Sequence, residues 1–132
     1  MNFDNKVVMI TGAARGLGQE YARQFATRGA SVIVSDVKDC TETRTVIESE
    51  GAKSLAFRTD VTDADSVRKM VEATVEEFGG IDILVNNAAL YGSLNFVPFD
   101  QVDESEWDST MDVNVKGIWQ CCKAAVLSLI HI

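Results

Sequence analysis

The sequence predicts an α/β fold with a doubly wound parallel sheet, in which helices cover both faces of the strands. Short apolar runs rich in Val and Ile alternate with longer segments of helical period. Because these runs are apolar at almost every position, they fit strands that are buried on both faces. Strand–helix–strand order at this spacing gives parallel strands joined by right-handed crossovers. The 132 residues are enough for one domain.

The first half of the chain contains two predicted strands and two predicted helices. The strands are residues 6–10 and 31–35, and glycines follow the first of them. Between them, apolar side chains recur every fourth residue from 17 to 25, which predicts a helix that ends at a glycine. A second helix is predicted over residues 41–50, and a glycine stops it as well.

The second half contains a weaker strand at residues 54–57, a strand at 81–85 and two further helices. Asp63 or Thr62 caps the first of these helices, which ends at a glycine pair. Its apolar stripe consists of Val67, Met70, Val71, Thr74, Val75 and Phe78. The last helix starts near Glu104, and its stripe consists of Trp107, Met111, Asn114, Ile118, Cys121 and Ala125. An asparagine on an apolar face needs partners for its amide, so it is a candidate functional residue.

Composition and charge exclude several classes of function. Acidic residues outnumber basic ones 20 to 12, and the net charge of −8 argues against nucleic acid and against anionic membranes as partners. Cys40, Cys121 and Cys122 form no disulfide framework, and no cysteine–histidine cluster has the spacing of a metal site. The N-terminus lacks the basic-then-apolar order of a signal peptide, and no apolar run is long enough to span a membrane. We therefore expect a cytoplasmic protein with reduced thiols.

The turn after the first strand carries the clearest functional motif. It consists of Thr11, Gly12, Ala13, Ala14, Arg15, Gly16, Leu17 and Gly18. Glycines let the backbone turn sharply and bring N–H groups close to a phosphate, and the N-terminus of the next helix adds partial positive charge. Placed between a strand and a helix, this turn predicts a dinucleotide site. The alternative is a tight turn that binds no ligand.

The glycine spacing Gly-x-x-x-Gly-x-Gly resembles that of the short-chain dehydrogenase/reductase family. Three further motifs occur in the family's order: Asp60-Val61, Asn86-Asn87-Ala88-Ala89 and Val113-Asn114-Val115. The resemblance covers residues 6–126, and only Ala89 departs from the usual glycine. It implies a Rossmann-type sheet with the strand order 3-2-1-4, and a homo-oligomer for the full-length form.

The residue at the end of the second predicted strand bears on the choice of nucleotide. A carboxylate there, Asp36, accepts hydrogen bonds from both adenosine ribose hydroxyls and repels a 2′-phosphate, which favours NAD over NADP. Arg15 instead favours NADP, because members of the resembling family with a basic residue before the second glycine often use that cofactor.

The resemblance also assigns roles to the remaining motif residues. It places Asp60 and Val61 at the adenine, and Asn87 and Ala88 at the nicotinamide-side ribose. Asn86 is expected to tie the turn after the fourth strand together and is treated as structural.

The resemblance implies hydride transfer between NAD and a small carbonyl compound or secondary alcohol. The family uses a Tyr-x-x-x-Lys pair for the proton, but neither Tyr21 nor Tyr91 has a lysine four residues later. Only the water-holding asparagine has a counterpart, Asn114, for which a satisfied core asparagine is the alternative. Tyr91 is a candidate for the border of a substrate pocket, and His131 receives no role.

The last six residues, 127–132, can be encoded by CTG-TCT-CTT-ATA-CAC-ATC, which begins the mosaic end of a transposase adapter. We therefore expect an incomplete dinucleotide-binding domain over residues 1–126 and a non-native tail. Such a fragment, with an open fourth strand, would be marginally soluble and inactive. Two other functions stay open: a 3-oxoacyl-carrier-protein reductase that uses NADP, and a non-catalytic NAD-binding module.

Overall fold

A computed structural model describes residues 2–129, and its centre is a parallel sheet of four strands. The strand order is β3-β2-β1-β4, which confirms the predicted doubly wound, Rossmann-type topology. The strands are β1 (Val7–Thr11), β2 (Ser31–Asp36), β3 (Ser54–Arg58) and β4 (Ile83–Val85). The α-helices are α1 (Gly16–Ala26), α2 (Thr41–Ser49), α3 (Ala64–Phe78), α4 (Glu104–Met111) and α5 (Gly117–Leu129). A short 3-10 helix, Phe99–Gln101, precedes α4, and a π turn, Asp112–Lys116, joins α4 to α5.

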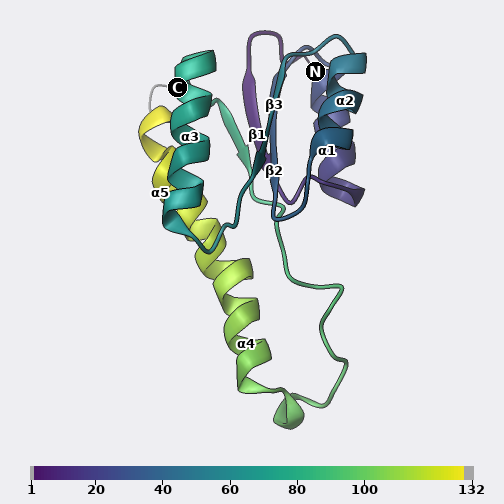
Figure 1. Cartoon of the computed structure of the whole chain (residues 1–132), viewed down its shortest axis with the longest axis vertical. Helices are drawn as coiled ribbons and strands as arrows, with labels where there is room; N and C mark the ends of the chain where they lie inside the picture. Colours follow the sequence, from purple (N-terminus) through teal and green to yellow (C-terminus); the bar gives the residue numbers. More distant parts are fainter. Residues whose placement is uncertain (1, 130–132) are drawn as a thin grey trace.

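Helices α1 and α2 cover one face of the sheet, and α3 and α5 cover the other (Figure 1). Strand β1 is buried on both faces, and its successive side chains enter different cores. Val8 and Ile10 pack toward α1 and α2, whereas Met9 packs toward α3 and α5. Asp63 caps α3 by accepting a hydrogen bond from Asp65 N at 3.0 Å, as one of the two predicted alternatives required.

β4 is shorter than predicted, because its paired register with β1 starts at Ile83 and residues 81 and 82 precede it. Ile81 is buried in the core, while Asp82 accepts a hydrogen bond from the backbone N–H of Val7 through Oδ2 at 2.8 Å. The backbone N–H of Asp82 also donates to Val7 O at 2.9 Å, so backbone and side chain of Asp82 together bind the start of β1. β4 is an edge of the four-stranded sheet, and its three residues are only half-buried.

Helix α4 and the segment before it extend beyond the carboxyl edge of the sheet (Figure 1). The predicted apolar stripe of the last helix is therefore wrong in its first part. Trp107 is 60% exposed and Met111 is 41% exposed, whereas Cys121 and Ala125 are buried. The π turn inserts one residue between the two helices and shifts the face that they present, a change that regular 3.6-residue periodicity does not anticipate.

Three residues of the predicted tail, 127–129, continue α5. The Ser128 hydroxyl accepts a hydrogen bond from Ile81 N at 2.7 Å. Residues 130–132, including His131, lie outside the described part of the chain. Within residues 2–129, no helix combines the length and the apolar character that crossing a membrane requires.

Candidate functional site

A cleft of about 920 Å³ lies at the carboxyl edge of the sheet. Its walls come from the β1–α1 turn, the ends of β2 and β3, the segment after β4, and the region where α4 meets the π turn. The predicted cofactor-binding residues that line it are Gly12, Arg15, Gly16, Leu17, Asp36, Asp60, Val61, Asn87 and Ala88. Gly18 lies behind the turn instead, and Asn114 is not part of the lining. A crevice at the carboxyl ends of parallel strands is the usual ligand site of such sheets.

The three glycines of the β1–α1 turn are needed for different structural reasons. Gly12 has φ +66°, and a Cβ there would lie 2.6 Å from Ala88 Cα. Gly16 has φ +60°, and a Cβ there would meet no atom within 4 Å, so this position faces open space at the cleft. A Cβ on Gly18 would collide with the Gly12 carbonyl oxygen. Gly18 therefore permits close packing of α1, while Gly16 leaves room for a ligand.

The Asp36 carboxylate is fixed at the cleft by two backbone N–H groups. Its Oδ2 accepts a hydrogen bond from Ala14 N at 3.1 Å, and its Oδ1 accepts one from Lys38 N at 3.0 Å. Each carboxylate oxygen retains capacity for another donor. Arg15 and Lys38 also line the cleft, so two cationic side chains lie on the same wall as this carboxylate.

The turn after β3 forms another part of the wall. Asp60 Oδ1 accepts hydrogen bonds from Thr62 N at 2.9 Å and from the Thr62 hydroxyl at 2.7 Å. Val61 is buried against Gly117, where a Cβ would lie 2.6 Å from Val61 Cγ2. This glycine lets α5 approach the turn and holds Val61 at the cleft.

The expectation that Asn86 ties the turn after β4 together is wrong, because the neighbouring Asn87 makes these hydrogen bonds. Asn87, rather than Asn86, ties the turn together: its Nδ2 donates to Thr11 O at 3.1 Å and to Gly12 O at 2.9 Å. Asn86 Nδ2 has only Cys122 Sγ at 3.5 Å, and the buried Asn86 Oδ1 has no partner among the described residues. Asn87 therefore belongs to the cleft wall and supports the glycine turn from behind.

The Thr11 hydroxyl was not predicted as a site residue, yet it joins the same two turns. Its Oγ1 accepts hydrogen bonds from Asn87 N at 3.2 Å and from Ala88 N at 3.1 Å. Its place at the end of the first strand was visible in the sequence, but the identity of its partners was not. Ala89 has no positive φ, since Asn5 is the only described non-glycine residue in that region.

Asn114 lies in the π turn, and Leu90 engages both ends of its side-chain amide. Oδ1 accepts a hydrogen bond from Leu90 N at 2.7 Å, and Nδ2 donates one to Leu90 O at 3.1 Å. Leu90 therefore engages one N–H and one lone pair of this amide, and the other N–H and lone pair have no side-chain hydrogen bond among the described residues. Leu90 and the exposed Tyr91 line the cleft, so Asn114 fixes part of the wall without lining it.

Cysteine chemistry and metal ligation find no support at this site. Burial raises the pKa of the Cys40 thiol to about 11, with Asp36 and Asp39 adding to the effect. Burial likewise raises the pKa of Cys121 to about 11. Across residues 2–129, no three potential ligands of the His, Cys, Asp or Glu type gather as a metal site would need.

Comparison with known proteins places this arrangement among the dehydrogenases. The family profile described as short chain dehydrogenase matches residues 6–131. Galactitol 2-dehydrogenase of Agrobacterium fabrum is 43% identical over 117 residues, which cover 89% of this chain. A 3-oxoacyl-[acyl-carrier-protein] reductase of Staphylococcus aureus is 34% identical over 96% of this chain. Carveol dehydrogenase from Mycobacterium avium, solved in complex with NAD, superposes with a TM-score of 0.91 and 26% identity over 97% of this chain.

The chain spans about half the length of these relatives. It covers 44% of the galactitol 2-dehydrogenase, 51% of the reductase and 50% of the carveol dehydrogenase.

Proposed function

The chain belongs to the short-chain dehydrogenase family, and from that premise we propose that it is the nucleotide-binding part of an NAD-dependent oxidoreductase. The whole enzyme would transfer a hydride between NAD and a small carbonyl compound or secondary alcohol. The residues present fit such a cofactor. Gly16 leaves open space beside the N-terminus of α1, where backbone N–H groups and the helix dipole favour a diphosphate.

The single observation that carries the choice of NAD is the fixed carboxylate of Asp36. Because Ala14 N and Lys38 N both donate to it, this carboxylate cannot swing away from an adenosine ribose without losing two hydrogen bonds. A 2′-phosphate beside it would meet an immobile negative charge, while ribose hydroxyls would find an acceptor. Asp60 and Val61 would border the adenine, and Asn87 and Ala88 would border the nicotinamide-side ribose.

When bound, nicotinamide supplies the hydride-transfer chemistry, and the residues of this chain bind and orient it. We assign Asn114 the role of fixing the Leu90 segment beside the reacting end of the cleft. Its Oδ1 accepts one bond from Leu90 N and has a further lone pair for a water molecule. Tyr21 and Tyr91 are followed at four residues by Phe25 and Asn95, so the proton-transferring Tyr-x-x-x-Lys pair is assigned to the missing part of the enzyme. We retain the proposal that residues 127–132 derive from an adapter.

The test is the affinity of the purified chain for NADH and NADPH, measured by the fluorescence of the reduced nicotinamide. We expect NADH to bind at least about tenfold more tightly than NADPH, which corresponds to about 1.4 kcal/mol. Asp36→Ala should weaken NADH binding and narrow this ratio. Asp39→Ala is the matched control. Asp39 also accepts hydrogen bonds, from the backbone N–H and hydroxyl of Thr41, but it does not line the cleft.

A second candidate function has its own supporting observation. Arg15 and Lys38 line the cleft and could receive a 2′-phosphate, as an NADP-dependent 3-oxoacyl-carrier-protein reductase would need. Tighter binding of NADPH than of NADH would favour this candidate over the first. A chain that binds neither nucleotide would refute both.

A further inference from the structure

A threonine on α2, Thr43, forms a hydrogen bond with the β1–α1 turn, 30 residues earlier in the chain. Thr43 is fully buried, and its hydroxyl donates a hydrogen bond to the carbonyl oxygen of Ala13 at 2.7 Å. Gln19 on α1 in turn donates from Nε2 to the Thr43 hydroxyl oxygen at 3.1 Å. The Thr43 hydroxyl thus links the glycine turn to two helices, with both its donor and its acceptor function engaged.

Ala13 lies in the β1–α1 turn, so the hydrogen bond from Thr43 restrains the backbone of this turn. Ala13 N donates to Ser35 O at 2.9 Å, and the next amide, Ala14 N, donates to the Asp36 carboxylate. The peptide group between Ala13 and Ala14 is therefore held through its carbonyl by Thr43 and through its N–H by Asp36. This peptide lies between Gly12 and Gly16, two glycines with positive φ.

We propose that Thr43 is a positioning residue for the β1–α1 turn, and that its hydroxyl sets how tightly this turn binds a dinucleotide. The inference rests on the proposed function, because it assumes that the turn receives the diphosphate. A turn held before the ligand arrives loses less conformational freedom on binding. Without the hydroxyl, the buried Ala13 carbonyl would lack its partner, and the turn would move to find another.

The test compares Thr43→Val, which has nearly the same shape but no hydroxyl, with Thr43→Ser, which keeps it. Thr43→Val should raise the Kd for NADH about three- to tenfold, the range that the loss of one hydrogen bond predicts. Thr43→Ser should restore most of the affinity. Because Lys38 N still holds the Asp36 carboxylate, the ratio of NADPH to NADH affinity should change less than in Asp36→Ala.

A second readout needs no nucleotide. In the free chain, hydrogen exchange at the amides of Ala13 and Ala14 should be faster in Thr43→Val than in the wild type. Gln19→Met removes the donor that orients the hydroxyl without opening the core, so it should give a smaller change in the same direction. If the wild-type chain binds no NADH, the proposed function fails, but the exchange rates still test the role of Thr43.

Thr74→Val is the matched control for the loss of a buried threonine hydroxyl. Thr74 is also fully buried, but it donates to Met70 O within its own helix α3, outside the cleft lining. It should leave NADH affinity and exchange at the turn unchanged. Unaltered affinity and exchange in Thr43→Val would overturn the proposal, as would an equal loss of affinity in Thr74→Val.

Discussion

The side chain of Asn87 holds together two turns that are 75 residues apart in sequence. Its single amide nitrogen donates to the carbonyls of both Thr11 and Gly12. Its neighbour Asn86 has one weak contact with a sulfur atom, and its buried Oδ1 has no hydrogen-bond partner within residues 2–129. The two asparagines are chemically identical, so their different surroundings offer a direct test of which hydrogen bonds matter.

We expect Asn87→Ala to lower the free energy of unfolding by about 1–3 kcal/mol, because it leaves two backbone carbonyls without a donor. Asn86→Ala is the control and should cost less. Urea unfolding of both variants measures the difference. A larger loss in Asn86→Ala than in Asn87→Ala would contradict the assignment.

The sequence could not distinguish these two residues. Both follow β4, and the direction in which each side chain points depends on where the strand ends, which is the least certain feature of a sequence-based prediction. The glycine turn could be predicted from the sequence, because its strand, glycines and helix are adjacent in the chain. Thr43 could not be predicted as a site residue, since its partner Ala13 lies 30 residues away in the sequence.

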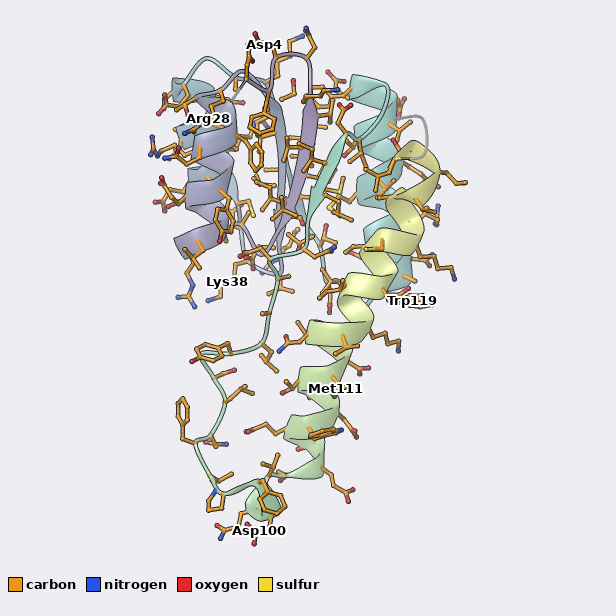
Figure 2. All side chains as sticks on the ribbon, turned by 180° about the vertical axis from the view of Figure 1, so that it is seen from behind. Asp4, Arg28, Lys38, Asp100, Met111 and Trp119 are labelled. Atoms are coloured by element: carbon orange, nitrogen blue, oxygen red, sulfur yellow. The ribbon has the colours of Figure 1, made fainter. Side chains whose placement is uncertain are left out.

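At the scale of elements, helix α4 has little burial to stabilise it, and its N-terminus is capped by Asp103. None of its residues is buried, and it projects beyond the sheet (Figure 2). The sequence predicted one long helix because apolar residues recur at spacings of three and four across the π turn. Periodicity shows where an apolar face lies, but only the packing shows whether anything covers that face.

The N-cap of α4 gives a prediction about pH. Hydrogen bonds from the Ser105 backbone N–H and hydroxyl hold the pKa of Asp103 below the ordinary aspartate value of 3.8. The ionised carboxylate therefore stabilises the folded helix above that ordinary value, and the contribution is lost as pH falls through the lowered pKa. We expect hydrogen exchange at the Ser105 amide to accelerate over this acidic range, measured by NMR.

Asp103→Asn separates the cap from the acid sensitivity of the rest of the chain. An asparagine oxygen accepts the same hydrogen bond but does not titrate, so the protection of Ser105 should change less with pH in this variant. If wild type and variant lose protection in parallel, Asp103 is not the group responsible.

At the scale of the whole molecule, two surfaces within residues 2–129 are left uncovered in addition to the proposed nucleotide cleft. The half-buried β4 forms one edge of the sheet, and Trp107, Met111, Ile118 and Trp119 are exposed on α4 and α5. Exposed strand edges and large apolar patches promote association. The net charge of −8 opposes it through repulsion that salt screens. All residues that line the cleft come from one chain, so we expect the proposed nucleotide binding not to depend on self-association.

The cleft and the missing proton donor together predict a chain that binds NADH without catalysing a reaction. The glycine turn is formed and the Asp36 carboxylate is fixed in this chain, so we expect the chain to bind NADH by itself. Proton transfer lacks its Tyr-x-x-x-Lys pair. We therefore expect no steady change in NADH absorbance when the purified chain is mixed with ketones, or with secondary alcohols and NAD.

Gly16→Val is the control against contaminating dehydrogenases from the expression host. Its φ of +60° strains a β-branched residue, and the added side chain would enter the space beside the N-terminus of α1. Turnover that persists in this variant at the wild-type rate belongs to a contaminant. Turnover that the variant abolishes would mean that the chain carries a proton donor of its own, and Tyr91, exposed at the cleft, would be the first residue to replace.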